Sequence, residues 1–239
     1  MNIAVVLAGG SGLRLGGDIP KQFLEVDGKP IIAYTIEAFE RNPHIDEIAV
    51  VSRPENVDLM WEIVRRFRYV KVKKVLVGGK ERYDSSLAAI AAYDNPDDVL
   101  LLHDGVRPLV SQQIIDRCVE AMKGYNAVGV AVKTTDTIVE VDQQGRIVAT
   151  PSRTSLRNMQ TPQCFRHGVI RKAYEVALHD PAFITTDDCG VVAKYLPDVP
   201  VLIVEGEASN IKVTYKEDLA LMRQIFQKDK HQPNNPNRQ

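Results

Sequence analysis

Hydrophobic residues along the chain gather in short runs that alternate with longer segments of mixed polarity. Strand-like runs lie at 2–7, 47–52, 70–77, 98–103 and 127–132, and helix-length segments separate them at about 31–41, 56–67, 82–93 and 111–122. A helix at 171–178, a strand at 200–204 and a last helix at 216–226 follow. This alternation predicts an α/β fold with a mostly parallel sheet and helices on both faces. Ser111 should cap the helix after it, and Gly124 should end that helix.

The alternation breaks at 135–150, where two β-rich stretches flank a polar turn at 142–145. This pattern predicts a long β-hairpin inserted into the α/β core, an arm over about 134–151. An isolated hairpin is marginally stable, so we expect the arm to pack against something, such as its copy in a dimer. We expect residues 1–227 to form a single domain and the polar stretch 228–239 to be a disordered tail.

Composition narrows the possible partners and the compartment. The chain has 239 residues, 44% of them hydrophobic, and a formal net charge of −1, which favours neither a nucleic-acid nor a membrane surface. Its three cysteines, Cys118, Cys164 and Cys189, fit neither a disulfide framework nor a zinc pattern. The chain begins in a strand with no basic leader, and no apolar run approaches the ~18–20 residues of a membrane span. We therefore expect a cytoplasmic protein.

The first strand runs directly into a glycine-rich loop that also carries two cations. The glycines are Gly9, Gly10, Gly12, Gly16 and Gly17, and the cations are Arg14 and Lys21. Backbone without side chains can approach an anion closely, and cations neutralise it, so the loop is suited to a polyphosphate. The carboxyl end of a parallel strand is also where such sheets bind ligands. A loop that merely reverses the chain is the alternative, but it would need no cations.

Two familiar phosphate-binding motifs do not fit this loop. The third glycine of a G-x-G-x-x-G pattern falls one place late, at Gly16, and no Gly-Lys-Ser/Thr ending is present. The second strand also ends without the acidic residue that would bind a dinucleotide ribose. These departures oppose a Rossmann dehydrogenase and a Walker-type nucleotidase.

Other candidates follow the later strands. Asp104, after the fourth strand, is placed to hold Mg²⁺, or else it orders the turn by pairing with Arg107. His103 beside it is more typical of a structural residue. The segment 78–86 opens a helix and can bind a base or phosphate, or simply cap the helix. Residues 185–189 have the composition of a helix cap, and Lys212 lies in a β-prone segment where most lysines face solvent.

Taken together, these stretches resemble one enzyme family. The ordered set is Ala8-Gly-Gly-Ser-Gly-Leu-Arg14, Pro20-Lys-Gln-Phe23, Gly78-Gly-Lys-Glu-Arg-Tyr-Asp-Ser85, His103-Asp-Gly-Val-Arg-Pro108, Asp136-Thr137, Gln160-Thr-Pro-Gln163, Thr186-Asp-Asp188 and Asn210-Ile-Lys-Val-Thr214. It resembles the cytidylyltransferases of sugar-alcohol phosphates, and most closely the 2-C-methyl-D-erythritol 4-phosphate cytidylyltransferase family of the non-mevalonate isoprenoid pathway. The resemblance extends over about residues 2–226.

The resemblance implies a Rossmann-like nucleotidyltransferase sheet with a hairpin arm, a homodimer joined through that arm, and a Mg²⁺-dependent reaction between CTP and an alditol phosphate. The acceptor's phosphate oxygen would attack the α-phosphorus of CTP, and pyrophosphate would leave. The implied catalytic residues are Arg14, Lys21 and Lys212. The implied CTP-binding residues are Leu7, Ala8, Gly9, Gly10, Ser11, Gly12, Gly79, Ser85 and Asp104, with Asp104 also at the Mg²⁺. Thr137, Arg153, Arg107 and Asp187 would bind the acceptor.

Two other functions stay open at this point. A sister family transfers cytidylyl to ribitol 5-phosphate for wall or capsule polymers and shares nearly all the nucleotide motifs. Thr186-Asp-Asp188 and the segment before Gln160 resemble the methylerythritol group, whereas Val106, Asp136–Glu140 and Cys189 resemble the ribitol group. A nucleotide-binding module without catalysis is the other alternative. Loss of Arg14, Lys21 or Asp104 would mark such a module, and all three residues are present.

Overall fold

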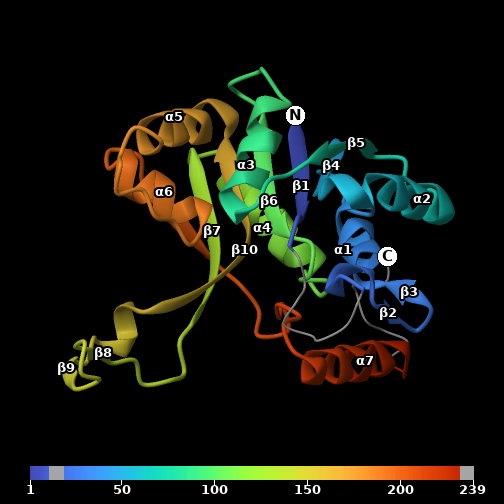
Figure 1. Ribbon diagram of the computed structural model, residues 1–239. Helices are drawn as coiled ribbons and strands as arrows, with labels where there is room; N and C mark the ends of the chain where they lie inside the picture. Colours follow the sequence, from blue (N-terminus) through green and yellow to red (C-terminus); the bar gives the residue numbers. More distant parts are fainter. Residues whose placement is uncertain (11–18, 232–239) are drawn as a thin grey trace.

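A seven-stranded sheet forms the centre of the computed structural model, which describes residues 1–10 and 19–231 (Figure 1). The strands are β1 (Asn2–Ala8), β4 (Glu47–Ser52), β5 (Val72–Val77), β6 (Val99–Asp104), β7 (Ala127–Lys133), β10 (Arg157–Arg166) and β11 (Val201–Glu205). Their order across the sheet is β11-β7-β10-β6-β1-β4-β5, and only β10 runs antiparallel to its neighbours. The predicted mostly parallel α/β fold is confirmed.

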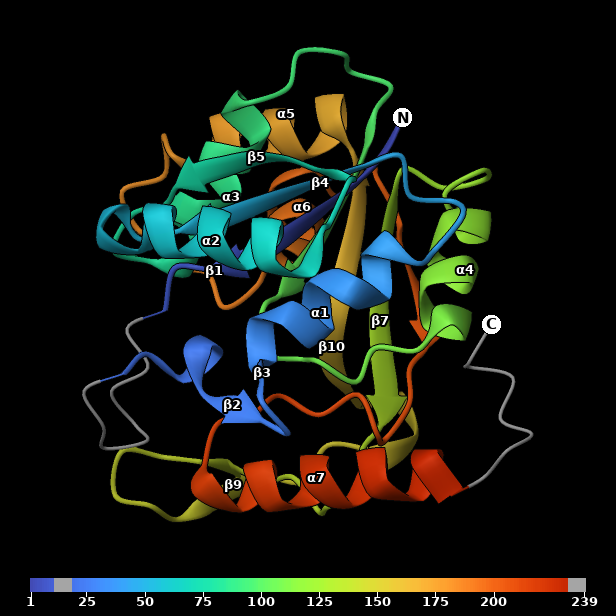
Figure 2. The same cartoon turned by 90° about the vertical axis from the view of Figure 1, so that its right-hand side faces the viewer.

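Helices cover both faces of this sheet, because its strands are apolar on both sides. On one face pack α1 (Ile31–Glu40), α2 (Val57–Phe67) and α4 (Gln112–Ala121), which lie in front of the sheet in Figure 2. On the other pack α3 (Arg82–Ala91), α5 (His167–Ala177) and α6 (Asp188–Tyr195). Within β1, Val6 joins the first layer and Val5 the second, as the two-residue period of a strand requires.

A third, smaller apolar cluster lies below the carboxyl ends of the strands. It is formed by Val26, Ile31, Val106, Val213 and Met222. The contributing elements include β2 (Glu25–Val26) and the helix α7 (Lys216–His231); β3 (Lys29–Pro30) pairs with β2, and η2 (Lys21–Phe23) precedes it. This cluster supports the loops at that edge of the sheet from beneath. None of the described helices is long and apolar enough to cross a bilayer.

The element boundaries follow the sequence prediction with few exceptions. Ser111 caps α4 as predicted, since its hydroxyl accepts a hydrogen bond from the Ile114 amide, but the helix ends at Ala121 rather than at Gly124. The helix α7 continues to His231, so 228–231 belong to a helix and not to the predicted disordered tail. The remainder of that tail, 232–239, lies outside the described residues.

The strand β10 was not among the predicted elements. Its middle, Gln160-Thr-Pro-Gln163, is polar and contains a proline, which is unusual in a central strand. The register of β10 against β7 shifts between Met159 and Gln163, so this stretch is irregular. Its buried polar side chains find hydrogen-bond partners at the end of β6, at the start of α6 and on the loop after β11, all distant in sequence, which no local pattern reveals.

The predicted hairpin is present as an arm that projects away from the sheet (Figure 1). It contains β8 (Glu140–Val141) and β9 (Ile147–Ala149), which are shorter than the β-rich stretches of the sequence. Asp142 organises the turn between them by accepting hydrogen bonds from the amides of Gln144 and Arg146. Gly145 has a φ of +79°, a left-handed conformation that favours glycine. The 3-10 turn η4 (Arg153–Ser155) follows the arm.

Candidate functional site

A cavity of about 590 Å³ opens at the carboxyl ends of β1 and β6. These two strands are neighbours at the point where the strand order reverses, which is the usual ligand position in such sheets. The structure brings most of the predicted nucleotide residues to this cavity: Leu7, Ala8, Gly9, Gly10, Lys21, Ser85, Asp104 and Lys212. It also adds lining residues to which the sequence assigned no binding role: Gln22, Lys80, Glu81, Arg82 and Val106.

Not every predicted site residue can be placed at the cavity. Ser11, Gly12 and Arg14 lie outside the described residues. Gly79 does not line the cavity itself, but the next residue, Lys80, does. A Cβ added at Gly79 would lie only 2.5 Å from the Asp84 side chain. Close packing against the start of α3 therefore requires glycine at this position.

Asp104 lies at the centre of the cavity floor and contacts three cations. Its Oδ2 is 2.9 Å from Lys212 Nζ and 3.3 Å from Arg107 Nε, and its Oδ1 is 3.5 Å from Arg82 Nε. Burial by itself would raise the pKa of this carboxyl. The charges of Lys212, Arg82 and Arg107 outweigh burial and hold the pKa of Asp104 well below its usual range. Asp104 is therefore ionised at all physiological pH values.

Arg82 connects the cavity to the helix layer behind it. Its Nη1 is 2.6 Å from Oδ2 of the fully buried Asp188, whose Oδ1 accepts a hydrogen bond from the Tyr174 hydroxyl. Burial would lower the pKa of Arg82, but Asp188 and Asp104 reverse that effect and raise it. Sequence reasoning missed Arg82, although it lies within the quoted 78–85 stretch, because its partner Asp188 is 106 residues away.

Two glycines allow the loops to close around Ser85. A Cβ added at Gly9 would lie 2.8 Å from Ser85 Oγ, and one at Gly78 would lie 2.6 Å from it. The cap of α3 is formed instead by Glu81 and Asp84, whose side chains bond each other's backbone amides. The capping alternative thus applies to Asp84, whereas Ser85 lines the cavity.

The glycine loop is held by a residue that sequence reasoning passed over. Gln22, on η2, is buried, and its Nε2 donates to the carbonyl oxygens of Ala8 (3.0 Å) and Gly10 (3.2 Å). This fixes the backbone that leaves β1. The signal available in the sequence was the Pro20-Lys-Gln-Phe23 stretch, but no spacing rule shows that its glutamine points back at the loop.

Two of the predicted acceptor-binding residues have partners within the protein. Arg107 donates from Nη1 to the carbonyl oxygen of Asn210 (2.8 Å) and from Nε to Asp104. Asp187 caps α6, since its Oδ1 accepts from the Gly190 amide (2.8 Å) and its Oδ2 from Gln163 Nε2 (2.8 Å). Neither residue lines the cavity: Arg107 contacts it through Asp104, and Asp187 caps α6.

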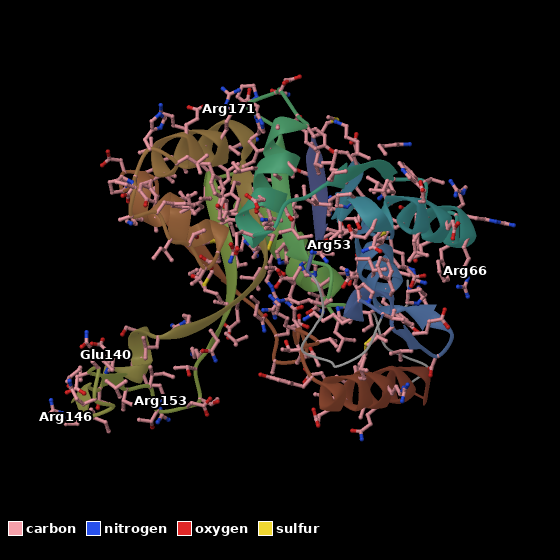
Figure 3. All side chains as sticks on the ribbon, viewed as in Figure 1. Arg53, Arg66, Glu140, Arg146, Arg153 and Arg171 are labelled. Carbon is pink, nitrogen blue, oxygen red and sulfur yellow. The ribbon has the colours of Figure 1, made fainter. Side chains whose placement is uncertain are left out.

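The other two acceptor candidates lie together on the arm. Arg153 Nη2 donates to the hydroxyl of Thr137 over 2.9 Å, so residues on the two sides of the hairpin meet. Neither lines the cavity of its own chain, and Figure 3 shows Arg153 on the arm that projects away from the sheet. Any contact between this pair and a ligand in a cavity would come most directly from a second copy of the chain.

His103 is a structural residue, as its position in the sequence suggested. It is completely buried, its Nε2 lies 3.1 Å from the Arg107 carbonyl oxygen, and its Nδ1 lies 3.0 Å from Thr161 Oγ1. A carbonyl can only accept, so Nε2 carries the proton and Nδ1 accepts from the Thr161 hydroxyl. The hydroxyl in turn accepts from the Asp104 amide (3.1 Å). The imidazole therefore orders the turn that presents Asp104.

Asp104 is the carboxylate best placed to hold a divalent cation. In the described ranges 1–10 and 19–231, no three His, Cys, Asp or Glu side chains converge on a possible metal position. One carboxylate suits Mg²⁺ in nucleotide enzymes, because phosphate oxygens and water supply its remaining ligands. The residues present therefore fit a metal that arrives with a nucleotide, and not a metal held by protein alone.

Comparison with known proteins identifies the family. The sequence model of the family described as IspD, 2-C-methyl-D-erythritol 4-phosphate cytidylyltransferase, matches residues 2–228. The chain belongs to this family. It is 48% identical over 229 residues to the 2-C-methyl-D-erythritol 4-phosphate cytidylyltransferase of Thermobifida fusca, with 93% of this chain and 92% of that protein covered.

Two further similar proteins are informative, one about the fold and one about the acceptor. A crystal structure of 4-diphosphocytidyl-2C-methyl-D-erythritol synthase from Anaerococcus prevotii superposes with a TM-score of 0.83 at 32% identity, covering 95% of this chain and 96% of that one. The bifunctional ribulose 5-phosphate reductase/CDP-ribitol pyrophosphorylase Bcs1 of Haemophilus influenzae is 40% identical over 96% of this chain, which spans 49% of that longer protein.

The buried imidazole predicts a pH dependence of stability. Burial lowers the pKa of His103 to about 4 from its ordinary 6.5. Between these values the unfolded chain binds a proton that the folded chain does not, so stability falls as the pH falls. Acidification from pH 7 to pH 5 should remove about 2 kcal/mol through this residue.

Urea denaturation at both pH values measures this effect. In a His103→Gln variant the loss between pH 7 and pH 5 should shrink by about that amount. His179→Gln, at an exposed position, is the matched control and should keep the wild-type pH dependence. If His103→Gln kept the wild-type pH dependence, the burial of His103 would not be the cause of the loss of stability at pH 5.

Proposed function

We propose that this protein transfers CMP from CTP to 2-C-methyl-D-erythritol 4-phosphate and releases pyrophosphate. The observation that carries the proposal is the convergence of the glycine loop, Lys21 and the Lys212–Asp104 pair at the cavity of a chain belonging to this family. In this reaction a phosphate oxygen of the acceptor forms a bond to the α-phosphorus. The bond from that phosphorus to the bridging oxygen breaks, and pyrophosphate takes its electron pair.

The side chains of the cavity suit a reaction that needs positioning and charge stabilisation rather than a covalent intermediate. The nucleophile is already an anion, so it needs no activation by a base. Cys164 and Cys189 are buried, which argues against catalysis by a thiol. Lys21 and Arg14 neutralise the phosphates that gain charge, and Lys212 binds the α-phosphate. Cations preorganised in a cavity are worth more than the same cations in water.

The remaining residues bind and orient the nucleotide. The loop from Leu7 to Gly12, with Ser11, wraps the triphosphate, and Ser85 with the backbone at Gly79 binds the cytidine. Asp104 would orient the ribose and would provide one carboxylate ligand to Mg²⁺. When bound, Mg²⁺ supplies further neutralisation of the triphosphate and of the leaving pyrophosphate. An enzyme of this kind would work in the cytoplasm, where three buried free cysteines stay reduced.

A second acceptor, ribitol 5-phosphate, is favoured by one observation, the 40% identity to a protein named a CDP-ribitol pyrophosphorylase. The experiment that separates the two acceptors is pyrophosphate release from CTP and Mg²⁺ with each offered separately. We expect a strong preference for methylerythritol phosphate. Preference for ribitol 5-phosphate would replace the proposed acceptor, and binding of CTP without turnover on either would support the non-catalytic module.

Lys21→Ala should lower kcat by roughly 10²- to 10³-fold, because a cation aimed at developing charge is lost. Lys21 is only half-buried, so the melting temperature should change little. Lys123→Ala is the control, since Lys123 is an exposed lysine paired with Glu120 away from the cavity. Near-normal turnover of the Lys21 variant, measured by pyrophosphate release, would contradict the mechanism.

We further propose a homodimer in which the arm of each copy reaches the cavity of the other. The arm exposes Ile138, Val139, Val141, Ile147 and Val148, an unusual apolar surface for two strands of two and three residues. We expect sedimentation equilibrium to give a dimer, and replacement of Ile147 and Val148 by aspartate to give a monomer with reduced turnover. A wild-type monomer with full activity would refute the dimer.

Arg153→Ala should raise the KM for the acceptor by about 10- to 100-fold and leave the KM for CTP nearly unchanged, because a charge-assisted bond to phosphate is lost. Arg146→Ala is the matched control, an arginine on the same arm that pairs with Asp142 at the turn. Both arginines are labelled in Figure 3. Equal effects on both substrates would remove Arg153 from the acceptor site.

Mixing two impaired variants, assayed at an acceptor concentration below the KM of the Arg153 variant, tests whether the arm acts across the dimer. A heterodimer of Lys21→Ala and Arg153→Ala subunits combines an intact cavity on one chain with an intact arm on the other. Activity restored on mixing supports the shared site, and no restoration despite heterodimer formation contradicts it.

A further inference from the structure

Lys212 lies on a segment that has no regular secondary structure. Residues 210–214 are neither helix nor strand, and the Lys212 side chain is 43% exposed. Its ammonium nonetheless lies 2.9 Å from Asp104 at the cavity floor. A long, half-exposed lysine side chain does not hold its backbone in place, so the position of Lys212 depends on contacts made by its neighbours.

Asn210, two residues before it, makes those contacts on one side. It is completely buried, and its Nδ2 donates to the Thr161 carbonyl oxygen (2.9 Å) and to Gln160 Oε1 (3.2 Å). Its own carbonyl oxygen accepts from Arg107 Nη1 (2.8 Å). Exchanging the oxygen and nitrogen of the amide would place two oxygens face to face at Thr161, so this orientation is the one the surroundings select.

Val213, one residue after Lys212, makes the contacts on the other side. Its amide donates to the Val106 carbonyl oxygen over 2.8 Å, and its side chain is completely buried in the cluster with Met222. The backbone of Lys212 is thus fixed between two buried residues. The Asn210 side is anchored by hydrogen bonds from a side chain, whereas the Val213 side is anchored by a backbone hydrogen bond and apolar packing. A substitution of Asn210 therefore removes hydrogen bonds without opening the apolar cluster.

The anchor of Asn210 is tied to Asp104 as well. Thr161, whose carbonyl oxygen accepts from Asn210, also accepts from the Asp104 amide through its hydroxyl (3.1 Å). One residue of β10 therefore holds both members of the Lys212–Asp104 pair. Thr161 and Asn210 thus add to the direct bonds between the two segments, which run from Val213 to Val106 and from Arg107 to Asn210.

The side-chain amide of Asn210 is only partly paired. Its Oδ1 is buried and has no hydrogen-bond partner in the part of the chain that the structure describes. An unsatisfied buried acceptor typically costs about 1–3 kcal/mol. The hydrogen bonds of Asn210 that the structure shows are those of its Nδ2 and its backbone carbonyl, and these fix the segment that carries Lys212.

We propose that Asn210 is the positioning residue for Lys212, holding its ammonium where the α-phosphate of the nucleotide binds. The inference rests on the proposed cytidylyltransferase function. Asn210 is completely buried outside the lining of the cavity and acts through the backbone that carries Lys212. Misplacement of a reacting group by about 1 Å can cost on the order of 100-fold in rate.

Asn210→Ala should therefore lower kcat by roughly 10- to 100-fold and weaken CTP binding to about the extent that Lys212→Ala does. Asn210→Ser is a second variant that keeps a polar side chain, but its hydroxyl is too short to reach Thr161. It should lower kcat and CTP affinity to the same extent as Asn210→Ala. Steady-state kinetics gives kcat, isothermal titration calorimetry with CTP gives the affinity, and thermal unfolding shows that each variant is folded.

Asn42→Ala is the matched control. Asn42 is also completely buried, and its Nδ2 donates to Gln112 Oε1 (3.0 Å) and Asp116 Oδ1 (2.8 Å), away from the cavity. It should lose a comparable melting temperature but keep kcat and CTP affinity. The double variant Asn210→Ala/Lys212→Ala should be no worse than Lys212→Ala alone, because both changes remove the same interaction.

Three results would overturn the proposal: wild-type kcat and CTP affinity in a folded Asn210 variant, additive losses in the double variant, or equal losses in Asn42→Ala. Failure of the proposed function is distinguishable from these. In that case the wild-type protein would release no pyrophosphate with either acceptor, while the CTP titrations of the single and double variants would still test whether Asn210 positions Lys212.

Discussion

The buried carboxylate of Asp104 is the constraint on which the rest of the site depends. An ionised carboxylate removed from water must be paired, and here Arg82, Arg107 and Lys212 all approach it. These cations come from the start of a helix, a turn after a strand and an irregular segment far along the chain. Asp104 and Asp188 together balance two of these three positive charges, and the remaining positive charge favours an anionic ligand.

Each cation is in turn held by a second interaction. Arg82 reaches back to the buried Asp188, and Arg107 donates to the Asn210 carbonyl oxygen. Lys212 depends on the anchors that flank it. The cavity is thus built on fixed side chains rather than on long cations free to move, which is what electrostatic preorganisation requires. The antiparallel strand β10 supplies Thr161 and Gln163 to this arrangement, so an element without a predicted pattern proves central to the site.

Within one chain, the cavity and the Thr137–Arg153 pair lie apart. The reversal of strand order between β1 and β6 places the start of the glycine loop beside Asp104, whereas Thr137 and Arg153 meet on an arm outside that cavity. The two groups are therefore carried by different elements: the cavity by the edge of the central sheet, and the Thr137–Arg153 pair by the segments that flank the two strands of the hairpin.

The sequence determined the fold class and most of the nucleotide site, because both depend on local patterns. Two-residue and helical periodicities gave the parallel strands and their helices, and loops after strands in a parallel sheet must converge at one edge, which brought Gly9, Lys21, Ser85 and Asp104 together. Tertiary structure alone decided the strand β10, the Arg82–Asp188 pair and the anchoring of Lys212 by Asn210. Each of these rests on hydrogen bonds or ion pairs between residues distant along the chain, and single-sequence periodicity contains no information about such partners.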